Sequence, residues 1–200
     1  VEQSGDVTCI ANLAWRNGSS IVINPQRPQI EDLDSLPHPA WHLFRKRRRS
    51  YMIYGSRGCP FNCNFCQRAL GQKLRLRSPE NIMAEIDYLV KEFDCRFVDF
   101  EDETFALKKD HALRICEMLF ERGYHKTIKW SANMRVNLAD AGLFAKMKEA
   151  GCHMIAFGVE SGNPEILAAS GKGIKIEQAE EAFKLCHQAG IPSTALFILG

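Results

Sequence analysis

The chain has 200 residues, which is long enough for one sizeable domain with a full apolar core. Hydrophobic residues make up 46% and charged residues 25%, the composition of an ordinary soluble globular protein. The formal net charge of +2 points to no particular partner, and no apolar run approaches the ~20 residues that a membrane span needs.

Residues 1–50 are predicted to form a short β-hairpin followed by a proline-rich linker. Residues 8–24 predict two strands joined by a turn at Asn17 and Gly18. The segment 25–41 carries four prolines with scattered acids, which is typical of a linker. A basic run follows, made of Arg45, Lys46, Arg47, Arg48 and Arg49. We interpret it as a solvated linker and not as a nucleic-acid-binding patch, because one short basic run gives only a weak electrostatic signal for nucleic acid.

From residue 51 onward the pattern becomes strand, loop and helix, repeated. Five strands are predicted, at residues 50–55, 96–100, 127–134, 153–159 and 193–199. Helices are predicted between them, over 78–93, 108–123, 138–151 and 176–190, with a short one opening at Asn163 and Pro164. Because parallel neighbours need a helical crossover, this alternation predicts an α/β fold with a parallel sheet. A closed or partial barrel and an open doubly wound sheet both fit the pattern.

Polar residues follow four of these strands, and strand ends are where functional groups gather in either architecture. Three cysteines follow the first strand, and Glu101 begins the acidic segment "EDETF" after the second. Ser131, Asn133 and Arg135 alternate along one face of the third strand, and "GVESG" closes the fourth. Each could be a solvated loop residue, but their shared location favours a site.

The trio Cys59, Cys63 and Cys66 lies within eight positions. Zinc would need a distant fourth ligand, because His42 and His111 lack finger-like spacing. A redox dithiol would use Cys63 and Cys66 and leave Cys59 superfluous. An iron–sulfur cluster is normally held by four thiolates, so three would leave one iron open to water or a substrate.

The remaining cysteines stand alone in apolar surroundings, where a free thiol behaves as a small hydrophobe, and we expect them in the core. A disulfide framework does not suit a chain of this size without a signal peptide, so a reducing, cytoplasmic setting is expected. These five residues are Cys9, Cys95, Cys116, Cys152 and Cys186.

The segment "CPFNCNFC", with C-x3-C-x2-C spacing directly after the first strand, resembles the motif of the radical S-adenosylmethionine (SAM) superfamily. The resemblance implies a [4Fe–4S] cluster on Cys59, Cys63 and Cys66, whose fourth iron chelates the amino and carboxylate groups of SAM. One electron from the cluster then cleaves the S–C5′ bond, and the resulting 5′-deoxyadenosyl radical abstracts a hydrogen from substrate. It also implies a partial (β/α)6 barrel of the TIM type, with five of the six strands present and the sixth beyond residue 200.

The same resemblance implies further cofactor-binding residues. Phe65 occupies the aromatic place whose backbone lies near the adenine of SAM. Asp102 and Glu103 stand where the family has a Gly-Gly-Glu-like element for the SAM amino group. Arg135 and Glu160 match positions that meet the SAM carboxylate and ribose.

The end of the fifth strand adds two more expected contacts. "LFILG" resembles the family's G-x-I-x-G element through Ile198 and Gly200, with Leu196 in place of the first glycine. Ile198 would then pack on the adenine.

The residues of the segments "FEDETF" and "MKEAGCHMIAFGVESG" resemble those of the branch of the superfamily that also carries a cobalamin-binding domain. Residues 1–50 would then be the hairpin and connector from that upstream domain, and 51–200 the radical SAM core. The implied reaction is cobalamin-dependent methyl transfer, with ring formation or rearrangement also found in the branch. A tRNA methylthiotransferase is the rival within the enzyme class, and a non-catalytic zinc-stabilised binding module is the rival outside it.

The expected partners follow from the same resemblance. They are a small-molecule or peptide substrate and an electron donor such as flavodoxin or ferredoxin. Nucleic acid is not expected, and neither the substrate nor a catalytic residue beyond the cluster ligands can be named from the sequence.

Overall fold

The computed structural model describes residues 5–44 and 48–199, and it divides into two compact units, Val1–Glu31 and Asp32–Gly200. In the first unit, β1 (Ala14–Asn17) pairs antiparallel with β2 (Ser20–Ile23), which confirms the predicted hairpin. Asn17 pairs with Ser20, so the turn is Gly18-Ser19, one position later than predicted. Gly18 has a φ of 61°, a left-handed conformation that glycine adopts without strain.

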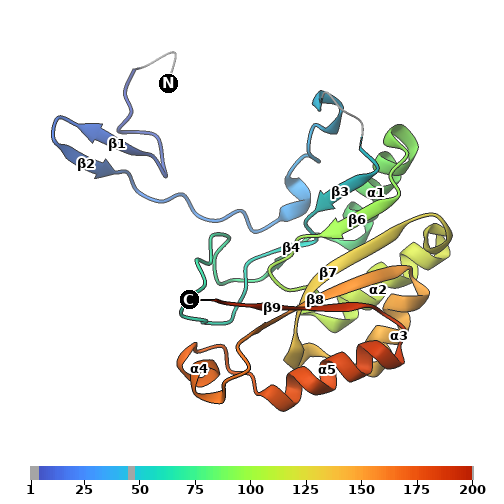
Figure 1. Ribbon diagram of the computed structural model, residues 1–200. Coiled ribbons are helices and arrows are strands. Elements are labelled where there is room, and N and C mark those ends of the chain that lie inside the picture. The colour runs from blue at the N-terminus through green and yellow to red at the C-terminus, as the bar shows by residue number, and fades with distance from the viewer. Residues whose placement is uncertain (1–4, 45–47, 200) are drawn as a thin grey trace. The chain divides into compact units, whose positions relative to one another are not determined.

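The second unit is built on a five-stranded sheet in the order β3-β6-β7-β8-β9, with every neighbouring pair parallel (Figure 1). This confirms the predicted parallel α/β fold and the five strands. The strands are β3 (Ser50–Ile53), β6 (Phe97–Phe100), β7 (Lys129–Arg135), β8 (Cys152–Glu160) and β9 (Ser193–Phe197). A two-residue ladder that was not predicted, β4 (Ser56–Arg57) with β5 (Arg75–Leu76), closes the base of the cysteine loop.

The predicted helices all form, and sequence signals explain where they begin. The Ser78 hydroxyl accepts a hydrogen bond from Asn81 N (3.1 Å) ahead of Pro79, and Asp140 caps its helix through Leu143 N (2.7 Å). The helices are α1 (Pro79–Phe93), α2 (Lys109–Glu121), α3 (Ala141–Glu149), α4 (Pro164–Ala169) and α5 (Ile176–Gln188). Short 3₁₀ helices lie at η1 (Leu33–Ser35), η2 (Trp41–Leu43), η3 (Tyr124–Lys126) and η4 (Val136–Leu138). Among the described residues, no helix has both the length and the apolarity to cross a membrane.

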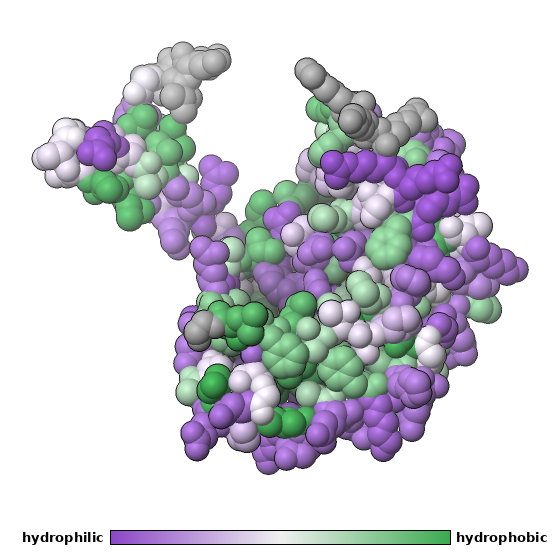
Figure 2. Space-filling view, viewed as in Figure 1, coloured by the Kyte–Doolittle hydropathy of each residue, from purple (hydrophilic) through white to green (hydrophobic). Residues whose placement is uncertain are grey.

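The long helices cover one face of the sheet (Figure 1). Side chains alternate between the faces along each strand, so Phe100, Trp130 and Phe157 are fully buried in the helix-side core. On β7 the alternate residues Ser131 and Asn133 point to the opposite face. Apolar side chains also gather on the surface over β9, where Leu196 and Phe197 are exposed (Figure 2).

Within the second unit, the segment from Asp32 to Phe44 packs against α1 and β3. The Trp41 indole donates to Glu85 Oε1 (3.0 Å) and meets the Tyr51 ring edge-on at 5.3 Å. Glu85 is buried and forms an ion pair with Arg77 at 2.6 Å, which supplies the partner that a buried charge needs. Of the predicted basic run, residues 45–47 lie outside the described residues, and Arg49 pairs with Asp94 at 3.0 Å.

Four of the five isolated cysteines lie in the core as predicted: Cys95, Cys116, Cys152 and Cys186. Burial raises the pKa of Cys95 to about 11 and of Cys116 and Cys186 to about 12, which suits inert structural thiols. The prediction for Cys9 was wrong. Its thiol is exposed in the hairpin unit, where the side chain donates to Asp6 O (3.2 Å) instead of packing in a core.

Candidate active site

A pocket of about 390 Å³ opens at the carboxyl ends of the strands, within the size range of ligand sites in enzymes. The segments that follow β3, β6, β7 and β8 all reach it, as the sequence predicted. The three clustered cysteines share the pocket with both acidic and basic side chains and with three larger apolar ones, Phe65, Met134 and Leu196. The lining comprises Cys59, Cys63, Phe65, Cys66, Glu101, Asp102, Glu103, Thr104, Asn133, Met134, Arg135, Ala156, Gly158, Glu160, Lys172 and Leu196.

The cysteine loop begins at a tight turn that only glycine fits. Gly58 has a φ of 91°, and a Cβ there would lie 2.2 Å from the backbone oxygen of Lys73. The next residue donates from its backbone, Cys59 N to Gly71 O (3.1 Å), which ties the start of the loop to its end. Cys63 is 7% exposed, Cys59 is half-buried and Cys66 is exposed, so the three thiols run from the floor of the pocket to its rim. Burial raises the pKa of the Cys59 thiol, partly offset by the Phe61 amide and by Arg135.

The innermost cysteine meets a buried cation. Arg135, 5% exposed, donates from Nη1 to Cys63 Sγ at 3.5 Å. The rest of the guanidinium contacts neutral groups: Nε donates to Asn137 Oδ1 (3.1 Å) and Nη2 donates to Lys172 O. The Arg135 Cζ atom also lies over the Phe61 ring, 3.6 Å from its centroid. Within the described part of the chain, no carboxylate forms an ion pair with Arg135.

The acidic residues after β6 hold the neighbouring strand end. The buried carboxylate of Asp102 accepts hydrogen bonds from Gly55 N (2.7 Å), Ser56 N (3.1 Å) and Ser56 Oγ (2.7 Å). Burial raises the pKa of Asp102 to about 6 despite these donors. Glu103 Oε2 accepts from Gly58 N at 3.2 Å, so both predicted acids contact the base of the cysteine loop.

A bulge in β8 aims Glu160 into the pocket. The pairing of β8 with β9 shifts register between Gly158 and Glu160, and Glu160 takes a φ of 69°, which costs a non-glycine residue of order 1 kcal/mol. Its carboxylate forms an ion pair with Lys172 Nζ. Gly158 leaves the room for this pair, since a Cβ there would lie 2.4 Å from Lys172 Nζ.

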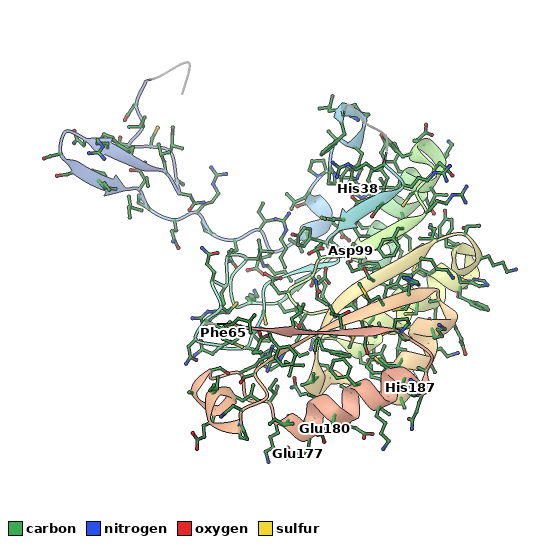
Figure 3. All side chains as sticks on the ribbon, viewed as in Figure 1. His38, Phe65, Asp99, Glu177, Glu180 and His187 are labelled. Atoms are coloured by element: carbon green, nitrogen blue, oxygen red, sulfur yellow. The ribbon has the colours of Figure 1, made fainter. Side chains whose placement is uncertain are left out.

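The structure brings most of the predicted residues to one pocket. The three cysteines, Phe65, Asp102, Glu103, Arg135 and Glu160 all line it. Figure 3 labels Phe65 on the cysteine loop, and Leu196 of β9 joins it in the pocket lining. Ile198 is 52% exposed and does not line the pocket, while Gly200 lies outside the described residues.

Sequence reasoning missed Lys172, which is 6% exposed and lies with its ammonium 6.0 Å from the Phe65 ring centroid. It belongs to the turn between α4 and α5, a segment without an obvious motif. The turn also binds the cysteine loop, because Asn64 N donates to Ser170 O at 2.9 Å and Asn64 Nδ2 donates to Ala169 O. The glycines on either side, in "SGKGIK", were the available signal for a tight turn.

The donor set suits a cluster with one open iron. Three thiols line the pocket, and its lining within the described residues contains no histidine or fourth cysteine. No three His, Cys, Asp or Glu side chains of the described part converge closely enough to hold a single metal ion. A [4Fe–4S] cluster does not need its ligands to converge on one ion, since each thiolate binds a separate iron. The buried guanidinium at Cys63 matches the negative charge that such thiolates carry.

The model of the Radical SAM superfamily matches residues 53–200, which is most of this chain. The chain belongs to the radical SAM superfamily. The family implies two cofactors for this pocket, a [4Fe–4S] cluster and SAM.

Curated relatives of this radical SAM chain include methyltransferases and a cyclase. "Uncharacterized methyltransferase PH0819" from Pyrococcus horikoshii is 35% identical over 199 residues, covering 96% of this chain and 43% of the relative. "Anaerobic magnesium-protoporphyrin IX monomethyl ester cyclase" from Cereibacter sphaeroides is 30% identical over 202 residues, covering 96% of this chain and 33% of the relative. The chain therefore spans less than half the length of these relatives.

Solved structures of radical SAM enzymes share the fold. The cobalamin-dependent radical SAM enzyme OxsB, solved with aqua-cobalamin and SAM, superposes with a TM-score of 0.82 at 22% identity, covering 98% of this chain and 30% of OxsB. The methyltransferase TsrM from Kitasatospora setae, solved with cobalamin and a [4Fe–4S] cluster, gives 0.67 at 18% identity, covering 74% of this chain and 31% of TsrM.

Proposed function

We propose that this chain is the catalytic core of a radical SAM enzyme that carries out cobalamin-dependent methyl transfer. The observation that supports it most strongly is the grouping of three cysteines, with no fourth cysteine or histidine among the described lining residues, around a pocket with both acidic and basic side chains. A cluster bound there would supply the single electron for reductive cleavage of SAM. Cobalamin, by this proposal, is bound by a separate domain of the whole protein.

We assign Cys59, Cys63 and Cys66 as the ligands of the cluster. Their placement supports this, because the loop that carries them is held at its start by the Cys59–Gly71 hydrogen bond and in its middle by the α4–α5 turn at Asn64. A fixed loop holds thiols in a defined arrangement before the metal arrives, which lowers the ordering cost of binding. The open coordination position would then face the pocket.

We assign the SAM contacts to the charged residues of the lining. SAM carries an amino group, a carboxylate and a sulfonium, so it needs neighbours of both signs. Glu103 would receive the amino group, and Arg135 with Lys172 would face the carboxylate. Glu160 would meet the ribose once SAM releases it from Lys172, and Phe65 and Leu196 offer the apolar contact for the adenine. Asp102 would act through the strand end that it holds, since its carboxylate already accepts three hydrogen bonds.

The methyl-transfer part of the proposal is supported by the relatives whose names carry that reaction. Besides the Pyrococcus protein, they include "Cytidylyl-2-hydroxyethylphosphonate methyltransferase" from Streptomyces wedmorensis, 26% identical over 232 residues. The cyclases at 30% identity favour ring formation as the second candidate reaction. In either case the electron donor would be a low-potential one-electron carrier such as flavodoxin or ferredoxin, and the substrate a small molecule or peptide.

Anaerobic reconstitution with iron and sulfide tests the proposal. We expect about four irons per chain, an EPR signal of the reduced protein that SAM perturbs, and 5′-deoxyadenosine or S-adenosylhomocysteine among the products once methylcobalamin is supplied to the full-length protein. Stoichiometric zinc without iron uptake would refute the cluster.

Cys63→Ala, with Cys95→Ala as the matched control, locates the cluster. Both thiols are buried, but Cys95 packs in the core away from the pocket. We expect Cys63→Ala to lose iron binding and keep its helical circular dichroism, because the loop contributes no helix. Cys95→Ala should keep the iron and lose about 1 kcal/mol of stability from the small cavity. Equal iron content in the two variants would contradict the assignment.

A further inference from the structure

The guanidinium of Arg135 touches a proposed cluster ligand, and its environment is unusual for a buried charge. A buried arginine normally pairs with a carboxylate, because an isolated ion is costly to remove from water. Arg135 instead contacts a thiol, an amide oxygen, a backbone oxygen and an aromatic ring. Of these partners only the thiol can become an anion.

Several elements fix the guanidinium in this position. Asn137 Oδ1, in η4 directly after β7, accepts a hydrogen bond from Nε at 3.1 Å, and the backbone oxygen of Lys172 accepts one from Nη2. The Phe61 ring, from the cysteine loop itself, lies 3.6 Å from the Cζ atom and stacks against the cation. Because these contacts come from three segments, the Nη1 donor that points at Cys63 has little freedom to turn away.

A second buried cation in the same pocket differs in its partner. Lys172 forms an ion pair with Glu160, and both side chains are largely buried, so this pair is neutral as a unit. Neither residue of the pair has a hydrogen bond to a cysteine among the described residues. The pocket therefore contains one cation that is free to act on the thiolates and one that is already neutralised.

We infer that Arg135 raises the reduction potential of the cluster through its hydrogen bond to Cys63, a role beyond binding of SAM. Hydrogen bonds to the sulfurs, net charge and solvent exposure set the potentials of iron–sulfur clusters. Reduction adds one negative charge next to the thiolates, and a buried positive charge 3.5 Å from one of them favours that state. Arg135 is thus a positioning and potential-tuning residue, and the inference rests on the proposed cysteine ligation.

An EPR-monitored redox titration of the reconstituted protein without SAM tests the inference. At a fixed applied potential we expect Arg135→Gln to lower the ratio of reduced to oxidised cluster about tenfold, equivalent to about 59 mV for a one-electron couple. Arg135→Lys keeps the charge but cannot span both Cys63 and Lys172, so we expect about a threefold lower ratio. The double variant Glu160→Gln/Lys172→Gln replaces one neutral pair by another and should stay within about twofold of the wild type.

The outcomes separate this inference from the proposed function. A wild-type protein that takes up no iron refutes the proposed function and the inference with it. Iron in every variant, with Arg135→Gln within twofold of the wild type, overturns the inference alone. So does an equal shift in the Glu160/Lys172 double variant. If Arg135→Gln holds no iron, Arg135→Lys decides: a threefold lower ratio supports the inference, and an unchanged ratio overturns it.

Discussion

The two sides of the pocket hold the cysteine loop by different means. On the side of β3 and β6, most of the contacts are to the backbone: the Asp102 carboxylate accepts hydrogen bonds from two backbone amides, and Cys59 N donates to Gly71 O. On the side of β7 and β8, side chains contribute most of the contacts. There Arg135 reaches Cys63, and the Asn64 amide donates to Ala169 O.

This difference predicts that the two sides of the pocket tolerate substitutions and ligand entry to different degrees. A backbone contact cannot shift without moving the β4–β5 ladder next to it, whereas a side chain can change rotamer at a cost of about 1 kcal/mol. The first side therefore sets where the loop begins. The second side can adjust through the exposed Asn64 amide when a ligand enters, while Arg135 stays held by its contacts to Asn137 and Lys172. Net charge follows the same division: Asp102 and Glu103 lie on the first side, and Arg135 lies on the second beside the neutral Glu160–Lys172 pair.

The largest expected effect is that of Gly58→Ala, which tests the backbone-held side. A Cβ at residue 58 would lie 2.2 Å from Lys73 O, and the φ of 91° is strained for alanine. We expect a loss of roughly 4 kcal/mol in the free energy of unfolding, from the left-handed conformation and the clash together. Urea denaturation followed by circular dichroism measures it.

Gly123→Ala is the matched control for that variant. Gly123 has a φ of 71°, but a Cβ there would have no atom within 4 Å. It should therefore show only the conformational cost, about 1 kcal/mol. Equal losses in the two variants would mean that the loop base yields to the added methyl group, contrary to a rigid first side.

The next effect in size is a pH dependence that Asp102 gives to stability. Burial raises its pKa from 3.8 to about 6 in the folded state, so folding favours the protonated form. The contribution of Asp102 is fully present below pH 3.8 and is lost as the pH rises through about 6. The shift corresponds to roughly 3 kcal/mol between these limits.

Asp102→Asn isolates this titration, because the variant has no proton to lose at that position. We expect the stability of the wild type relative to Asp102→Asn to fall by roughly 2 kcal/mol from pH 4 to pH 7, since part of the unfolded carboxyl is already ionised at pH 4. Denaturant midpoints across this range measure the difference. A difference that stays constant with pH would show that the Asp102 carboxyl titrates normally, with water reaching it.

The sequence was sufficient for the elements whose signals are local. Ser78 followed by Pro79, and Asn163 followed by Pro164, mark helix starts through a cap and a fixed φ, and both helices begin there. The spacing of the cysteine trio identified the loop, and the rule for strand ends placed Arg135 and Glu160 at the same pocket. These inferences need only neighbouring residues and the known geometry of parallel sheets.

The remaining parts of the site depend on contacts distant in sequence. Lys172 reaches the pocket only because the α4–α5 turn folds back onto the cysteine loop, over a hundred residues away from Asn64. The Arg135 contact with Cys63 spans 72 positions, and no periodic pattern encodes it. Ile198 does not line the pocket, whereas Leu196, which pairs with Gly158 ahead of the register shift, does.

The smallest expected effect tests the side held by side chains, at Gly171. A Cβ there would lie 2.3 Å from Asn64 Oδ1, and the φ is 65°, so Gly171→Ala combines strain with a clash against a side chain. We expect a loss of about 2 kcal/mol, less than for Gly58→Ala because the Asn64 amide can rotate away.

A double-mutant cycle with Asn64→Ala separates the two causes at Gly171. Asn64→Ala alone should cost about 1 kcal/mol for its lost hydrogen bond. In that background the clash is absent, so Gly171→Ala should cost only the strain, and the coupling energy should be about 1 kcal/mol. Urea midpoints of the four proteins give the coupling. Strict additivity would mean that Asn64 does not touch the turn in solution, and the contrast between the two sides would then rest on Arg135 alone.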